Sequence, residues 1–289
     1  MFALFQHDFI QNAFLVGTIV AIVTAIIGYF VVIRNEAFAG HALSHVGFAG
    51  ATGAAVIGAS ALLGTFAFTL LAALGIGALG RRAQGRDVEI GMVLSFALGL
   101  GVLFLSLYTN FATETVGVLF GSIFSVSHSD VMIMLYSSVA VLLLLAVIFR
   151  PLLFLSIDPE VAQARGLPIR LVSMIFLLLL AFTIAEAVQV VGVLLVFALL
   201  IAPAATAARI TSQPLLTIGL SIILGLIFTW AGLFLAVMGN WPVSFYIASF
   251  AAVAYFLSLA ISRKRVQKRA QVQIRESSRQ CTHALTEIK

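Results

Sequence analysis

The sequence AFLVGTIVAIVTAIIGYFVVI, residues 13–33, carries no charged side chain and is long enough to cross a lipid bilayer as one helix. Similar apolar runs recur along the chain as far as Ile261. Hydrophobic residues make up 62% of the chain and charged residues only 9%, a balance foreign to soluble domains. The run at 139–149 is apolar on every side, which excludes the alternating pattern of a β-barrel strand. The sequence therefore predicts an all-α polytopic membrane protein.

Arginines mark the boundaries between the apolar runs. They fall at Arg34, within 81–86, within 150–170, at Arg209 and within 263–269. Because basic loops stay on the cytoplasmic side of a membrane, we expect these loops and the polar, basic tail 263–289 to face the cytoplasm. Threading the runs between them predicts about nine transmembrane helices, with eight or ten as alternatives, in one domain over residues 1–262.

Three further features limit the organisation of the chain. The piece 117–126 is too short to cross alone and is interpreted as a re-entrant or capping segment. Residues 1–12 contain no Lys or Arg, so they predict no cleavable signal peptide and the first helix is retained. The pI of 9.8 reflects topology signals and a basic tail beside the lipid headgroups, so no nucleic-acid partner is expected.

Two histidines lie four residues apart in FAGHALSHVGFAG, residues 38–50. If this segment is helical, His41 and His45 share one face, one turn apart. Imidazole nitrogen is a common ligand for zinc and similar ions, so the pair is a candidate metal contact. A pair of hydrogen-bonded histidines at the membrane interface is the alternative, because two ligands do not complete a site.

An acidic residue and a proline stand out in the later apolar runs. Glu186 lies within such a run, and an ionisable group at that position is a functional-site hypothesis, with Gln189 one turn later. A carboxyl near the membrane surface is the alternative. Pro203 is expected to break or bend its helix and free a carbonyl that could line a path. His128 and Asp130 are interpreted as a loop followed by a helix N-cap.

A short capped helix is predicted inside the cytoplasmic loop 151–170. Asp158 is a good N-cap, Pro159 suits the first helical position, and Glu160 adds an acid to the first turn. Gly166, with Pro168 two residues later, supplies the stop. The helix is either a capped linker or a surface presented to a soluble partner.

Five segments resemble the membrane subunits of ATP-binding-cassette (ABC) importers for zinc, manganese and related divalent metals. In chain order they are 38–50, 86–91 (RDVEIG), 119–127 (LFGSIFSVS), 158–166 (DPEVAQARG) and 191–205 (VGVLLVFALLIAPAA). The resemblance implies the fold of vitamin B12 and siderophore importer permeases, in a bacterial-type plasma (inner) membrane. It also implies a second permease copy or close homologue, a cytoplasmic ABC ATPase and an extracytoplasmic metal-binding protein. The capped loop helix would then be the coupling helix, with Asp158, Pro159, Glu160, Ala164, Arg165 and Gly166 as its contact residues.

The resemblance also implies a site in the histidine segment. In the family this segment usually carries an Asp four residues before a His, and the pair is thought to contact the metal in transit. Here the Asp position is His41 and the His position is His45. A neutral nitrogen in place of a carboxylate oxygen disfavours manganese relative to zinc. Glu186 is the candidate for the replacement charge.

The leading prediction is thus a permease subunit that moves a divalent metal, Zn or Mn, with no permanently bound cofactor. The lysines lie only in the tail and outside any P-loop pattern, so the chain is not predicted to hydrolyse ATP itself. One alternative is a permease of the same fold for a metal chelate. Another is a stand-alone secondary transporter or channel in which Glu186 relays protons. An intramembrane enzyme is the weakest alternative, because no His-Glu-x-x-His pattern is present.

Overall fold

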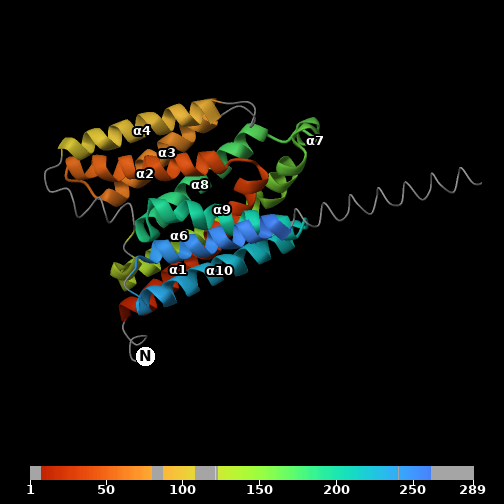
Figure 1. Ribbon diagram of the computed structural model, residues 1–289. Helices are drawn as coiled ribbons and strands as arrows, with labels where there is room; N and C mark the ends of the chain where they lie inside the picture. Colours follow the sequence, from red (N-terminus) through yellow and green to blue (C-terminus); the bar gives the residue numbers. More distant parts are fainter. Residues whose placement is uncertain (1–7, 80–86, 108–120, 122, 240, 262–289) are drawn as a thin grey trace, which may run out of the picture.

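The chain is described here by a computed structural model that covers residues 8–79, 87–107, 121, 123–239 and 241–261. Every regular element in those ranges is a helix (Figure 1). The elements are α1 (Asp8–Ile33), α2 (Ala37–Val56), α3 (Ala61–Leu79), α4 (Asp87–Leu107), η2 (Ile123–Ser125), α6 (His128–Ile157), α7 (Pro159–Ala164), α8 (Ile169–Val191), α9 (Val193–Ile210), α10 (Pro214–Met238) and a last helix, Val243–Ile261. The all-α prediction is confirmed for this part of the chain.

Most of these helices are long and apolar enough to cross a membrane. Within the described ranges 8 helices meet both conditions: α1, α3, α4, α6, α8, α9, α10 and the last helix. With 20 residues, α2 is also of spanning length, but His41, Ser44, His45 and its many small residues make it more polar. Counting α2, the described helices agree with the predicted number of about nine.

Several predicted features fall on residues that the structure does not describe. Arg81, Arg82 and Arg86 lie outside the described residues, as does the tail 263–289. Of the piece 117–126, only Gly121 and residues 123–126 are described. They contain η2, which has 3 residues and is far too short to cross a bilayer.

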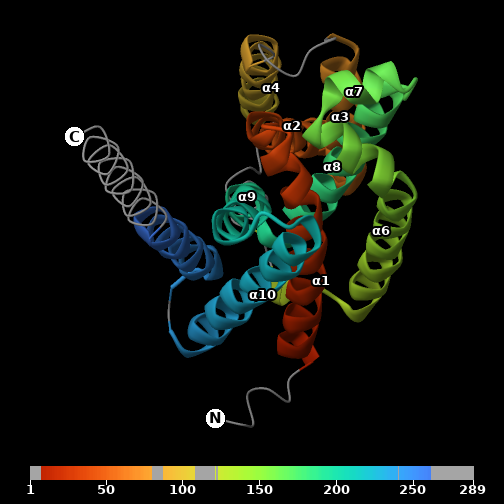
Figure 2. The ribbon, with the colours of Figure 1, turned by 90° about the vertical axis from the view of Figure 1, so that its right-hand side faces the viewer.

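The helices pack in two groups joined by α8. Figures 1 and 2 both show α2, α3 and α4 together on one side of the molecule and α1, α9 and α10 on the other. α8 contacts α3 and α2 in the first group and α9 and α1 in the second, while α6 lies against α1 and α8. α2 also contacts α9, so the histidine-bearing helix lies where the two groups meet.

Glycines allow the closest helix contacts. A Cβ at Gly50 of α2 would lie 2.8 Å from the carbonyl carbon of Gly64 in α3, and a Cβ at Gly64 would lie 2.9 Å from that of Gly50. A Cβ at Gly28 of α1 would lie 2.9 Å from the carbonyl carbon of Leu200 in α9. Lipid is as apolar as these helices, so the hydrophobic effect does not drive them together. Close packing of the helix backbones stabilises the contact instead.

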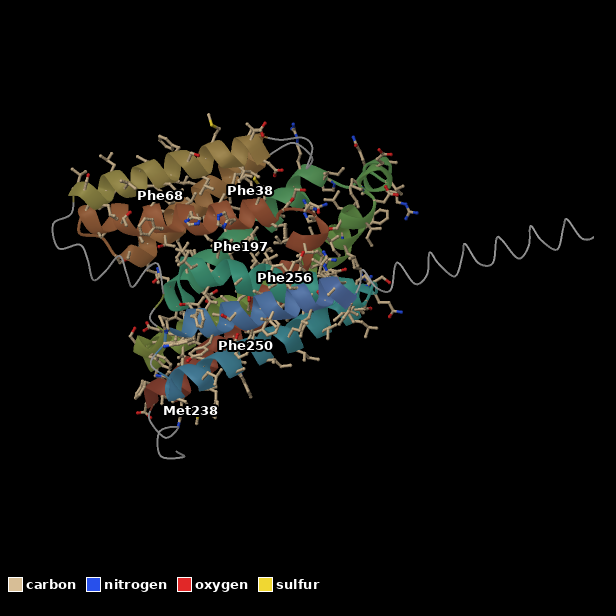
Figure 3. The ribbon with its side chains drawn as sticks, in the orientation of Figure 1. Phe38, Phe68, Phe197, Met238, Phe250 and Phe256 are labelled. Carbon is tan, nitrogen blue, oxygen red and sulfur yellow. The ribbon has the colours of Figure 1, made fainter. Side chains whose placement is uncertain are left out.

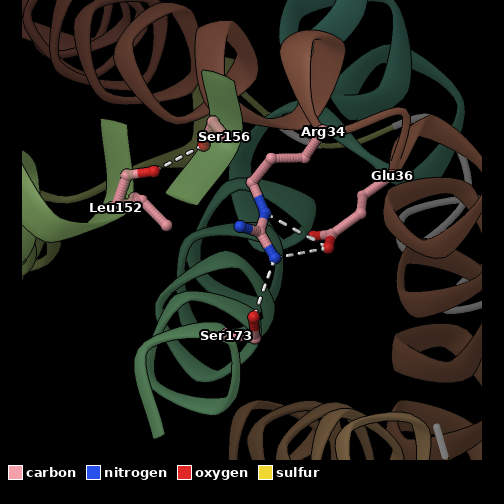
Figure 4. A network of polar contacts seen from close by, with 5 residues as sticks. All are labelled: Arg34, Glu36, Leu152, Ser156 and Ser173. Carbon is pink, nitrogen blue, oxygen red and sulfur yellow. Dashed lines mark hydrogen bonds and ion pairs between the residues drawn. The ribbon is translucent and has the colours of Figure 1, made fainter. Parts of the chain in front are cut away.

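The turn between α1 and α2 contains a buried ion pair whose arginine also bonds to α8 (Figure 4). Arg34 Nη2 lies 2.9 Å from Glu36 Oε1, and both side chains are about nine-tenths buried. The same Nη2 donates to Ser173 Oγ of α8 at 3.0 Å, and the guanidinium lies 5.3 Å from the ring centre of Phe176. Asn35, between the paired residues, has a φ of 55°. This network sets where α2 begins.

Two local predictions have different outcomes. Pro203 lies inside α9, which is continuous from Val193 to Ile210, so the helix does not break there. The interruption comes instead at Gly192, whose φ of 80° separates α8 from α9. The helix start near His128 and Asp130 is confirmed: Ser127 is the N-cap of α6 and forms a capping box with Asp130.

Candidate functional site

His41 and His45 lie one turn apart on α2. Their ring centroids are 4.7 Å apart and the ring planes are inclined by 79°. Both side chains are half-buried, and the His41 ring lies 5.0 Å from the ring of Phe197 in α9. The helical spacing predicted from the sequence is therefore present, and both imidazoles lie on the same face of α2.

The contact with α9 shows that the histidines lie within the bundle rather than at its edge. Phe197 follows the start of α9 by about 6 Å of helix and precedes its end at Ile210 by about 20 Å. One turn further along α9, the side chain of Leu200 lies 3.0 Å from where a Cβ of Gly40 would be. Figure 3 shows Phe197 near the centre of the bundle. The two imidazoles thus lie inside the bundle, where α2 packs on α9.

Glu186 is held by a different helix from the one that carries the histidines. Its side chain, only 9% exposed, lies on α8. Ser137 Oγ of α6 donates to Glu186 Oε1, and Ser138 Oγ lies 3.4 Å from the same oxygen. Gln189, close to one turn later, is half-buried. The two serines, which the sequence analysis missed, satisfy a carboxyl group that would otherwise be unpaired in the membrane.

The part of the chain that the structure describes does not assemble a complete metal centre. Among the described residues, no three His, Cys, Asp or Glu side chains are grouped so that they could hold a metal ion. The histidine pair supplies two nitrogen donors, and the carboxylate of Glu186 belongs to the α6–α8 contact. The arrangement suits an ion that passes and keeps part of its hydration, rather than a closed structural site.

The loop predicted at 151–170 is shorter in the structure, because α6 continues through Pro151 to Ile157 and α8 begins at Ile169, but its short helix is present as predicted from the residues. Asp158 Oδ1 accepts from the Val161 amide at 3.0 Å, Pro159 opens α7, and the φ of Gly166 is 76°. Ala162 is fully buried and fixes the helix to the bundle. The remaining predicted contact residues, Glu160, Ala164 and Arg165, are exposed, and the Arg165 guanidinium lies 5.5 Å from the ring centre of Phe154. α7 is therefore a rigid, capped, exposed element between α6 and α8.

The opposite end of the bundle is hollowed. A cavity of about 620 Å³ lies where α8 ends and the last helix begins. Its lining carries no charged side chain and includes Phe124, Val191 and Trp241. Gly121 closes one wall: a Cβ there would lie 2.6 Å from the amide nitrogen of Gly192. α8 spans the distance between this cavity and α7, which places them at opposite ends.

Comparison with known proteins identifies relatives along most of the chain. Residues 6–262 match the model of the ABC 3 transport family. The chain is 30% identical to the manganese transport system membrane protein MntC of Halalkalibacterium halodurans, over 91% of this chain and 90% of that protein. It is 32% identical to the manganese import system permease protein ScaB of Streptococcus parasanguinis, over 90% and 93%. It is 29% identical to the high-affinity zinc uptake system membrane protein ZnuB of Haemophilus influenzae, over 88% and 98%.

Solved structures show the same architecture. PsaBC from Streptococcus pneumoniae, in complex with Fab, matches with a TM-score of 0.79 and 31% identity, over 89% of this chain and 95% of that chain. An ABC transporter in an inward-facing conformation shares the fold, with a TM-score of 0.69, 18% identity and 86% of each chain covered. These relatives are membrane subunits, and an ATPase is a separate subunit in such systems. The chain therefore belongs to the ABC 3 transport family and is a multi-pass membrane permease subunit of an ABC transporter, not its ATPase.

Proposed function

We propose that the chain is the permease subunit of an importer for divalent transition metal ions. The observation that carries the proposal is the pair His41 and His45, held together inside the bundle on α2. The names of the relatives support it, because they are described as manganese or zinc transport proteins. The metal is cargo, and the chain needs no permanently bound cofactor to move it.

Zinc is the proposed preferred ion. Two imidazole nitrogens form the contact, and nitrogen donors suit zinc better than manganese, which favours carboxylate and water oxygens. The closely similar relatives named above are mostly manganese proteins, so the preference rests on the chemistry of His41 in this chain. Glu186 is proposed as a third contact that reaches the ion only when its bonds to Ser137 and Ser138 open.

The coupling surface is proposed at α7. A cytoplasmic ABC ATPase would contact Asp158, Pro159, Glu160, Ala164, Arg165 and Gly166, and a rigid capped helix transmits force better than a flexible loop. Pro203, inside α9 between the metal contact and the α9 end, is proposed as a point where that helix bends during gating. At the other end, the apolar cavity would face an extracytoplasmic metal-binding protein.

The assembly is proposed to lie in a bacterial-type plasma (inner) membrane. A second permease copy or close homologue would complete the path, and the tail 263–289 would face the cytoplasm. The arginine-bearing ends of the helices support this orientation, because Arg34 and Arg209 both lie at the ends of spans that would be cytoplasmic.

Uptake of labelled zinc and manganese into vesicles tests the proposal. The vesicles carry this chain with its ATPase and binding protein, and the variants are His41→Ala, His45→Ala and Glu186→Gln. Ser44→Ala is the matched control, because Ser44 lies between the histidines but its hydroxyl is already bonded to the Gly40 carbonyl at 3.0 Å. A further variant, His41→Asp, restores the carboxylate that the resemblance leads one to expect.

We expect zinc uptake to fall at least about tenfold in His45→Ala, while ATPase activity and assembly persist. His41→Asp should raise the ratio of manganese to zinc uptake. Uptake that is equal in His45→Ala and Ser44→Ala would refute the metal contact. An intact complex that moves neither ion would refute the free-metal cargo and favour a metal chelate.

A further inference from the structure

The turn between α1 and α2 contains a carboxylate oxygen that the proposed transport path does not use. Glu36 is 9% exposed. Its Oε1 accepts from Arg34 Nε at 3.2 Å and Nη2 at 2.9 Å, whereas Oε2 is buried and has no hydrogen-bond partner among the described residues (Figure 4). Buried polar atoms in folded proteins are almost always bonded, so an orphaned carboxylate oxygen indicates a missing ligand.

Glu36 borders a cavity of the right size for one such ligand. The cavity holds about 10 Å³, close to the space of one water molecule or one small ion. Asn35 and Asp87 supply its other polar lining, and Asp87 is in the first turn of α4. The remaining lining is apolar: Ala39, Ile76, Ile90 and Leu177. The cavity thus joins acidic side chains from two separate parts of the chain.

The charges at the cavity favour a cation over a water molecule. Glu36 and Asp87 bring two carboxylates to one small space, and like charges in a shared site repel each other. Arg34 compensates one of the two negative charges. A water could donate to both carboxylates, but it would leave the second charge in place. A cation satisfies Oε2 and removes the repulsion.

The donor set selects the class of cation. Carboxylate and amide oxygens are hard ligands, typical of Mg²⁺, Mn²⁺ and Ca²⁺, and such ions commonly keep several waters. The cavity itself holds only the ion, and because Asp87 is exposed, waters that complete the coordination would bind from the solvent side. This chemistry differs from that of the imidazoles at His41 and His45.

We propose that Glu36 and Asp87 bind one hard divalent cation at a site separate from the histidine pair. Along α2, Glu36 precedes His41 by about 7.5 Å of helix rise. Ala39, which lines the cavity, and His41, which packs on α9, lie two residues apart on α2, so the cavity and the histidines are on different sides of that helix. The binding of an ion at Glu36 and Asp87 therefore does not rest on the proposed function.

Manganese titration of the purified, full-length chain tests the site. The metal is stripped with a chelator, Mn²⁺ alone is added, and the electron paramagnetic resonance signal of free Mn²⁺ reports binding. The background variant His41→Ala/His45→Ala removes the histidine contact. In that background the test variants are Glu36→Gln and Asp87→Asn. Glu36→Gln keeps an oxygen that accepts from Arg34, and Asp87→Asn changes an exposed side chain, so the fold should be retained. Glu89→Gln is the matched control: an exposed acid in the same first turn of α4 that does not line the cavity.

We expect one Mn²⁺ to bind in the background variant and to be displaced by excess Mg²⁺. Its affinity should fall at least about tenfold in both Glu36→Gln and Asp87→Asn and stay unchanged in Glu89→Gln. Absence of binding in the background variant, or equal affinity in Asp87→Asn and Glu89→Gln, would overturn the site and leave a water in the cavity. Because this readout needs no transport, loss of uptake in the vesicle assay with Mn²⁺ binding intact would count against the proposed function alone.

Discussion

Replacing Gly28 with alanine tests the contact that brings α1 against α9. The added Cβ would lie 2.9 Å from the carbonyl carbon of Leu200 and closer still to its oxygen, whereas ordinary contact begins near 3.4 Å. The atoms that clash are backbone, so no side-chain rotation relieves the overlap. The two helices must therefore separate, by at least the roughly 0.5 Å that the carbon contact requires, in an interior that is packed almost without voids.

The magnitude follows from two opposing terms. Overpacking costs about 1–3 kcal/mol, and a clash between backbones belongs at the upper end of that range. Alanine has a higher helix propensity than glycine, so the exchange itself stabilises the helix by about 0.5–1 kcal/mol. We expect a net loss of about 2 kcal/mol. Gly75→Ala in α3 is the control, because its Cβ would meet nothing within 4 Å and the exchange should be neutral or stabilising.

Thermal unfolding of the detergent-purified variants measures the difference. Gly28→Ala should unfold several degrees below the native chain and Gly75→Ala at or above it. Leu200 also lies beside Gly40, so a displaced α9 should weaken the Phe197–His41 contact and lower zinc uptake. If Gly28→Ala were as stable as Gly75→Ala, the close packing of α1 on α9 would be refuted.

Three further predictions follow from single contacts. Arg34→Ala should lower the free energy of unfolding by about 3–5 kcal/mol, because it leaves Glu36 charged and unpaired. The added change Glu36→Gln should recover part of that loss, which thermal unfolding of the single and double variants measures. Glu186→Ala should cost about 0.5–1.5 kcal/mol because it removes the bond from Ser137, whose hydroxyl still has the Ile133 and Met134 carbonyls as acceptors, whereas Glu186→Gln keeps the bond and should unfold near the native temperature. Asp158→Ala removes the N-cap of α7, which stabilises that helix by about 0.5–2 kcal/mol. Metal-stimulated ATPase activity should therefore fall while global stability changes little. Equal activity in the variant and native complexes would contradict coupling through α7.

Local sequence patterns predicted the helical elements well. Apolar runs bounded by arginines indicated the spans because a helix satisfies its own backbone polar groups and needs only length and apolarity to cross a bilayer. The capped helix α7 was predicted equally well, because Asp158, Pro159 and Gly166 set its start and end within a few residues of one another. Pro203 was expected to break or bend its helix, but α9 is continuous through it, and the helix break lies before α9, at Gly192 with its positive φ.

The sequence predicted only part of the candidate site. The spacing of His41 and His45 placed both rings on one face of a helix, as the structure has them. The partner of Glu186 was missed, because Ser137 is 49 residues away in the sequence and a serine in an apolar run is unremarkable by itself. The opposite charges of Arg34 and Glu36, two residues apart at the end of an apolar run, were the one signal that could have pointed to the buried network at the α1–α2 turn.

The sequence by itself determined the class of this protein, its approximate number of spans, its family and the rigid helix α7. These properties depend on composition and on contacts within one or two helical turns. Only the tertiary structure decided that His41 packs on Phe197 inside the bundle, which helix engages Glu186, and that Glu36 Oε2, beside Asp87, has no hydrogen-bond partner among the described residues. Those facts depend on helices distant in the sequence, such as the bond from Arg34 to Ser173 across 139 residues, and apolar helices of similar composition carry little information about which neighbour each one meets.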